Sequence, residues 1–124
     1  MNKKRVDEWL LKAREALVSE GIASKDGKIN KTFRSQISSF GVAVIMGSFK
    51  SAVAFFAEQG GASVEREKLL SAIHMVVFGK SATPREVLEL VCSPGAEKYK
   101  DEFIDASIAL KLAMNFFELC ESKN

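Results

Sequence analysis

Histidine is almost absent from this chain of 124 residues, and that shortage limits the chemistry available to it. His74 is the only histidine, so the chain cannot supply the pair or cluster of histidines that many metal sites use. The two cysteines, Cys92 and Cys120, are too few for a disulfide framework, and both fall on apolar helical stripes. We therefore predict buried, reduced thiols, no metal site and no cofactor.

Long hydrophobic runs are also missing. No stretch approaches the roughly 18 apolar residues of a membrane-spanning helix, because Lys50 interrupts the best candidate. Near the start, Asp7 and Glu8 stand where the apolar part of a signal peptide would run. We expect an intracellular, cytoplasmic protein that does not act at a membrane.

Acidic residues are missing from one part of the chain. Between Gly27 and Ala57 there is no Asp or Glu, although four basic residues occur there. Residues 1–50 carry ten basic and five acidic side chains, whereas residues 51–124 carry eight and eleven. This asymmetry points to an anionic partner for the first half. The alternative is an ordinary solvated surface on which charges cluster by chance.

Apolar residues recur at three- or four-residue spacing, which is the period of a helix with one buried face. No segment shows the alternation or the turn pattern of paired strands. We predict an all-α fold in which residues 1–124 form a single domain, a compact bundle of about six helices. The residues expected to face its core are Val6, Trp9, Leu10, Ala13, Leu17, Phe33, Ile37, Phe40, Val44, Phe49, Ala52, Val53, Phe56, Leu69, Leu70, Ile73, Val76 and Val77, followed by a seam in the last helix at Ala96, Tyr99, Phe103, Ala106, Leu110, Ala113, Phe117 and Cys120.

Glycines and capping side chains mark the expected helix ends. Gly47 breaks the central apolar region into two helices, and Ser48 caps the second of them. The other expected markers are a stop at Gly21, an N-cap at Asn30 or Thr32, a stop at Gly60-Gly61 after a helix that reaches about Gln59, an N-cap at Ser63, and a capping box at Thr83-Pro84-Arg85-Glu86.

A catalytic constellation is not visible. His74 and Cys92 could in principle form a base and a nucleophile, but neither stands in a recognised local pattern. Asp101, Glu102 and Asp105 cluster at the start of the last helix, where interaction with the helix dipole accounts for them. We predict that the protein is not an enzyme.

The basic residues suggest a nucleic-acid-binding module instead. Lys31 and Arg34 lie one helical turn apart, and Lys50 opens the next helix with no acidic residue nearby. The phenylalanines of this region fall on apolar stripes, which favours contact with phosphates over stacking on bases. The candidate nucleic-acid-binding residues are Lys31, Arg34 and Lys50, together with a short basic arm of Lys3, Lys4 and Arg5.

Three short motifs carry a resemblance to a known family. They are Phe33-Arg34-Ser35, Gly47-x-x-x-x-Ala52-x-Ala54-Phe55, and Tyr99 followed by Ala106-x-x-x-Leu110-Lys111-Leu112. In this pattern, residues 30–120 resemble the small subunit of the Cmr (type III-B) CRISPR effector complex. The chain departs from the family at Phe40-Gly41, where Leu-Pro is usual, and at Gly47-Ser48-Phe49, where Gly-Leu is usual.

The resemblance implies a helical, non-catalytic subunit of an antiviral ribonucleoprotein. Such subunits stack on further copies of themselves, contact other subunits, and touch the backbone of guide RNA and target RNA. Of the candidate residues, only Arg34 matches a family position. Two alternatives stay open: a helical interaction or oligomerisation module that associates through the seam of the last helix, and a DNA-binding regulator. For the second, a helix-turn-helix within residues 83–100 would carry an acidic second helix, which suits a major groove poorly.

Overall fold

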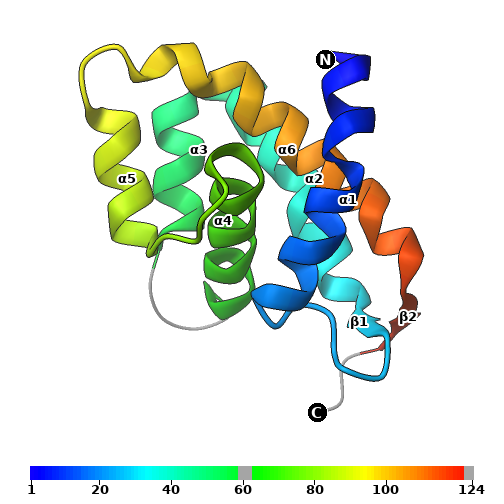
Figure 1. The fold of residues 1–124 in the computed structure, drawn as a ribbon. Coiled ribbons are helices and arrows are strands. Elements are labelled where there is room, and N and C mark those ends of the chain that lie inside the picture. The colour runs from blue at the N-terminus through cyan, green and yellow to red at the C-terminus, as the bar shows by residue number, and fades with distance from the viewer. Residues whose placement is uncertain (59–62, 122–124) are drawn as a thin grey trace.

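The structure, a computed structural model, describes residues 1–58 and 63–121 and confirms the all-α prediction (Figure 1). Within those residues, six α-helices pack into a compact bundle beside a very small parallel sheet. The elements are α1 (Lys3–Ser19), β1 (Lys28–Asn30), α2 (Lys31–Met46), α3 (Phe49–Phe56), α4 (Ser63–Phe78), α5 (Pro84–Cys92), the 3-10 helix η1 (Ala96–Tyr99), α6 (Lys100–Ala113), the 3-10 helix η2 (Met114–Phe116) and β2 (Glu118–Cys120).

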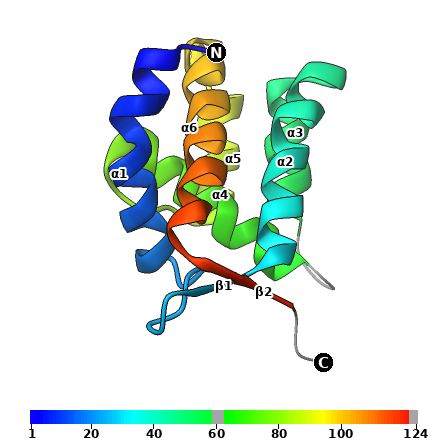
Figure 2. The same ribbon diagram turned by 90° about the vertical axis from the view of Figure 1, so that its right-hand side faces the viewer.

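Helix α6 is the centre of the bundle. It packs against α1, α2 and α4, and Figure 2 shows it between α1 and α2. Helices α3 and α5 pack against each other at the side of the bundle away from α1 (Figure 1). Aromatic rings join these layers, since Phe49 meets Phe103 edge-on at 5.0 Å between ring centroids and Phe40 meets Phe56 at 5.2 Å.

The predicted apolar stripes do form the core. All eight stripe positions of α2 and α3 are buried, from Phe33 to Phe56. Most of the predicted seam of the last helix is buried as well, including Phe103, Ala106 and Leu110. Because these side chains pack inside the bundle, the seam is not available as the self-association face that the oligomerisation alternative assigned to it.

Gly47 separates α2 from α3 as predicted, and the structure gives a steric reason. A Cβ atom at this position would lie 2.8 Å from Ser51 Oγ and 3.1 Å from the carbonyl oxygen of Ala43. Ser48 then caps α3, and its side chain accepts a hydrogen bond from the backbone N–H of Ser51 at 3.0 Å. Only glycine fits the turn without moving the cap.

The capping box before α5 is confirmed. The backbone N–H of Glu86 donates to the hydroxyl of Thr83 at 3.2 Å, and the Glu86 carboxylate accepts from the backbone N–H of Thr83 at 2.9 Å. The hydrogen bond from the Thr83 backbone N–H, followed by the Thr83 side chain, holds the pKa of the Glu86 carboxyl below its usual value. The N-cap of α2 is Asn30, one of the two residues predicted for this position, and not Thr32.

Two of the predicted helix-end signals fall at or next to residues 59–62, which lie outside the described ranges. Gly60-Gly61 lies outside the described residues, as does any side-chain cap made by Ser63, with which α4 begins. The helix that was expected to reach about Gln59 ends at Phe56.

The prediction of no strands was wrong. The prediction that the last helix continues to Cys120 was also wrong. Helix α6 ends at Ala113, and the chain tightens into η2 before it becomes extended at Phe117. Strand β2 then pairs in parallel with β1, and the backbone N–H of Glu118 donates to the carbonyl of Gly27 at 2.9 Å. This pairing joins segments about ninety residues apart, so a local apolar period could not show it.

The cysteines do not occupy the positions expected of them. Cys92 is exposed at the end of α5, and Cys120 is half-buried on β2 and not on a helical seam. Both thiols are free. Within the described ranges, no helix is long and apolar enough to cross a membrane.

Candidate nucleic-acid interface

Two of the predicted cations line one open groove, together with a third that the sequence analysis did not assign. Lys31 and Arg34 come from the first turns of α2, and Lys111 comes from the last turn of α6. The groove has a volume of about 510 Å³. We call it the basic groove, and its full lining is Lys31, Thr32, Arg34, Ser35, Ser38, Lys111 and Leu119.

Lys111 carried a sequence signal that was available but not used. It belongs to the third family-like motif, where it is the single charged residue between buried Leu110 and exposed Leu112. Lys111 is half-buried among apolar residues near the end of α6. A lysine in such a position packs its methylene groups on the apolar surface and keeps its ammonium in water. Only the packing of α6 against α2 brings that ammonium to the same groove as Arg34.

Two cations of the groove already have polar partners. Lys31 Nζ lies 2.6 Å from Glu121 Oε1, and Arg34 Nη1 donates to Asn115 Oδ1 at 2.9 Å. A guanidinium has five N–H donors and an ammonium has three, so neither group is saturated by one contact. Lys111 has no ion pair within residues 1–58 and 63–121.

A carboxylate also touches the groove wall. The hydroxyl of Thr32 donates to the Glu65 carboxylate of α4. The hydroxyl of Ser38 donates to the backbone carbonyl of Arg34 at 2.9 Å. The groove therefore has three basic side chains, the hydroxyl of Ser35, and two hydroxyls, those of Thr32 and Ser38, that already donate to protein oxygens.

Lys50 does not belong to the basic groove. It is exposed in the first turn of α3, beyond the Gly47 turn. The sixteen residues of α2 rise about 24 Å, so Lys50 at the start of α3 lies beyond the far end of the helix whose first turns carry Lys31 and Arg34. The face that Lys31, Arg34 and Lys50 were expected to share is split in two.

The predicted basic arm is instead the first turn of α1. Arg5 Nη1 lies 3.0 Å from Oδ2 of Asp105, whose residue is only 1% exposed. Lys4 Nζ lies 4.0 Å from Glu8 on the exposed side of the helix. Lys3 is exposed. Arg5 therefore ties α1 to α6, and of the three residues only Lys3 and Lys4 project freely enough to meet a ligand.

A second surface feature is apolar. Val42, Ile45 and Met46 are 59%, 76% and 81% exposed, and their spacing puts them on one outer face of α2. We call these three residues the α2 patch. They are not covered by any other described element, whereas their neighbour Val44 is buried in the core.

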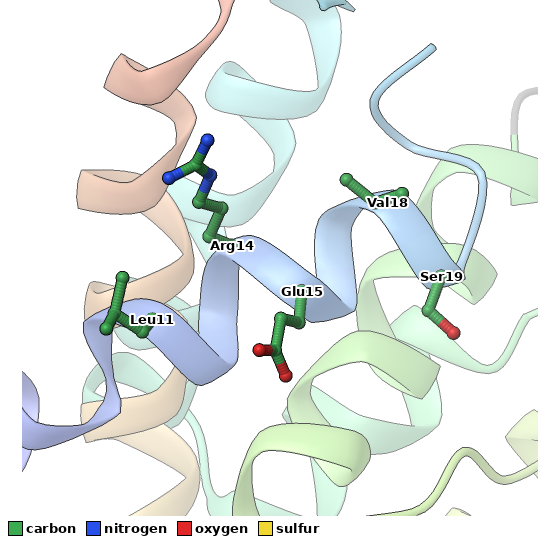
Figure 3. Close-up of a pocket in the computed structure, with 5 residues that line it drawn as sticks. All are labelled: Leu11, Arg14, Glu15, Val18 and Ser19. Atoms are coloured by element: carbon green, nitrogen blue, oxygen red, sulfur yellow. The ribbon is translucent and has the colours of Figure 1, made fainter. Parts of the chain in front are cut away.

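A further apolar surface lies along α1. The guanidinium of Arg14 sits 4.6 Å from the ring centroid of Phe116, and the exposed side chains of Leu11 and Val18 line the same hollow as Arg14. This open hollow of about 460 Å³ is lined by Leu11, Arg14, Glu15, Val18 and Ser19, and Figure 3 shows Arg14 and Val18 on one side of α1 and Glu15 and Ser19 on the other. We call the apolar members the α1 ridge: Leu11, Val18 and Phe116.

The residues considered for catalysis lie on three different helices, α4, α5 and α6, and two of them make packing or ion-pair contacts. His74 is buried, its Nδ1 lies 2.7 Å from the carbonyl oxygen of Lys80, and its ring packs against Phe78. Cys92 is exposed on α5, and Asp105 is held by Arg5. Among the residues that the structure describes, no group of three or more His, Cys, Asp or Glu side chains could hold a metal ion.

Comparison of the chain with protein-family models, curated proteins and solved structures finds no significant match. The resemblance to the Cmr small subunit therefore depends on the three sequence motifs alone. In the fold, residues of two of these motifs line the same groove. Arg34 of the first motif and Lys111 of the third face the same groove, although 76 residues separate them. Gly47 of the second motif forms the turn between α2 and α3.

Proposed function

We propose that this chain is a non-catalytic small subunit of a type III-B (Cmr) CRISPR effector complex, which acts in antiviral defence in the cytoplasm. In this role it contacts the sugar-phosphate backbone of guide RNA and target RNA. The observation that carries the proposal is the basic groove, where Lys31 meets Arg34 and Lys111, and the latter two come from two different family-like motifs.

The chemistry of the groove suits a phosphate backbone. Lysine and arginine supply charge-assisted donors to phosphate oxygens, and the hydroxyl of Ser35 adds a neutral one. The lining contains no aromatic side chain on which a base could stack. Such a surface binds the backbone of any sequence, which is what a subunit needs when base pairing between guide and target reads the sequence.

The apolar surfaces support contacts with protein partners. Contiguous exposed apolar side chains on a small domain commonly mark protein interfaces. The α2 patch and the α1 ridge lie on different helices, so one chain offers two separate contact surfaces. We assign them to other subunits and to further copies of this chain.

The DNA-binding alternative has little geometric support. After α5, residues 93–95 lead into the 3-10 helix η1, and the next α-helix begins only at Lys100. No second helix of residues 83–100 is therefore positioned to enter a major groove as the recognition helix of a helix-turn-helix does.

The test is binding of the intact chain to fluorescent RNAs of unrelated sequence, single-stranded and duplex, over a range of salt. Three phosphate contacts predict a slope of log K against log salt of about −2 for single strands and about −3 for duplexes. Equal affinity for the different sequences is expected. A marked preference for one DNA duplex, or no RNA binding at low salt, would contradict the proposal.

A further inference from the structure

The segment that follows α6 places two acceptors on the cations of the basic groove. Glu121 contacts Lys31 at 2.6 Å, Asn115 accepts from Arg34 at 2.9 Å, and Leu119 forms part of the groove wall. We call residues 115–121 the C-terminal segment. We propose that this segment competes with RNA phosphate for the basic groove, with the Glu121 carboxylate holding the phosphate position at Lys31 until RNA displaces it. The inference rests on the proposed function.

The register of the small sheet explains why Glu121 meets Lys31. Strands β1 and β2 are parallel, and Asn30 lies opposite Cys120. The residue that follows Asn30 is Lys31, and the residue that follows Cys120 is Glu121. The strand pairing itself therefore brings the two opposite charges together. The contact is thus built into the fold at the point where β1 becomes α2.

The strength of this contact is suited to displacement. The Lys31 and Glu121 side chains are 56% and 81% exposed, and an ion pair between exposed groups is weak because water and salt screen it. Strand β2 has only three residues, which is too short a pairing to hold the segment firmly. Lys111 has no ion pair among the described residues, so an incoming phosphate meets one unpaired cation and two that already contact Glu121 and Asn115. It competes most directly with the Glu121 carboxylate, because that group carries the same negative charge.

Glu121→Gln is the direct test, because it removes the charge and keeps the shape of the side chain. With the intact variant chain at low salt, we expect RNA to bind about two- to five-fold more tightly, the range that an exposed ion pair allows. The matched control is Glu118→Gln, which removes another exposed carboxylate of the C-terminal segment, one that has no ion pair within the described ranges. Its effect should stay below about 1.5-fold, because screening weakens charges that are not in contact.

A second variant isolates the contact. If Glu121 acts by occupying Lys31, then adding Glu121→Gln to Lys31→Gln should give no gain in affinity, since the two effects are coupled. Equal gains from Glu121→Gln and Glu118→Gln, or a gain that persists without Lys31, would overturn the competition.

Inorganic triphosphate separates this inference from the proposed function. Titration calorimetry should show tighter triphosphate binding by the Glu121→Gln variant than by the parent chain, whichever RNA result is obtained. If triphosphate binding rises but neither protein binds RNA, the competition stands and the RNA role fails. If RNA binds through the groove cations but Glu121→Gln changes neither ligand's affinity, the RNA role stands and the competition fails. Absence of binding to both ligands overturns both.

Discussion

Arg5 and Asp105 join the start of α1 to the middle of α6. Nη1 of the guanidinium lies 3.0 Å from Oδ2 of a carboxylate whose side chain is only 2% exposed. The backbone N–H of Asn2 adds a longer contact of 3.3 Å to the same group. Substitution of Arg5 by Met leaves a buried charge without its partner, and we expect the free energy of unfolding to fall by about 2–3 kcal/mol, because Arg5 is itself partly exposed. Urea denaturation measures this loss.

Lys4→Met is the control for that prediction. Lys4 is the preceding residue in the same helical turn, and its pair with Glu8 is exposed and 4.0 Å long. Its removal should change the free energy of unfolding by less than about 0.5 kcal/mol. If the two variants lost similar amounts of unfolding free energy, the Arg5–Asp105 pair would contribute no more to stability than an exposed ion pair.

Gly47→Ala should destabilise the protein. The new Cβ would approach Ser51 Oγ at 2.8 Å and a backbone oxygen of α2 at 3.1 Å, so the turn or the α3 cap must shift. A cost of about 1–3 kcal/mol is typical of such crowding. Thermal or urea denaturation followed by circular dichroism would detect it.

Gly41→Ala, inside α2 itself, is the matched control, and its effect should have the opposite sign. A Cβ at Gly41 meets no atom within 4 Å. Alanine in a helix interior is favoured over glycine by roughly 0.5–1 kcal/mol, so this variant should be more stable than the parent chain. Stabilisation by both substitutions would show that the Gly47 turn does not require glycine.

The α2 patch predicts a separation between folding and association. Ile45→Ser replaces a side chain that is 76% exposed, so the free energy of unfolding should change by no more than about 0.5 kcal/mol. Self-association in sedimentation velocity at high protein concentration should decrease. Val44→Ser, one residue away but buried, should cost about 2 kcal/mol or more in stability. Unchanged association of the Ile45 variant would remove the α2 patch from the proposed interface with further copies.

Much of the helical framework was predictable because its causes are local. The stripe from Phe33 to Val44 depends on residues three or four positions apart, and so does the capping box of Thr83 and Glu86. The Gly47 turn is also local, since the atoms that exclude a side chain there belong to Ala43 and Ser51.

The composition of the candidate site depends on contacts between distant segments. Lys111 joins Arg34 only because α6 packs on α2, and Glu121 reaches Lys31 only through the β1–β2 register. For the same reason Lys50, which is close to the groove cations in sequence, lies far from them along α2. A run of residues free of carboxylates says which segment is basic, whereas the direction of each helix decides which charges share a surface.

The central claim is that Lys31, Arg34 and Lys111 together bind RNA phosphates, and one comparison tests it directly. Replacing all three by Gln should make the slope of log K against log salt shallower by roughly 2–3 and weaken RNA binding at low salt. The comparison variant replaces the exposed Lys80, Arg85 and Lys98 by Gln, which removes the same net charge on or close to α5 in the chain. Figure 1 shows α5 on the side of the bundle away from β1 and β2. The account predicts that this second variant binds RNA nearly as tightly as the parent chain. Equal weakening by the two triple variants would contradict it.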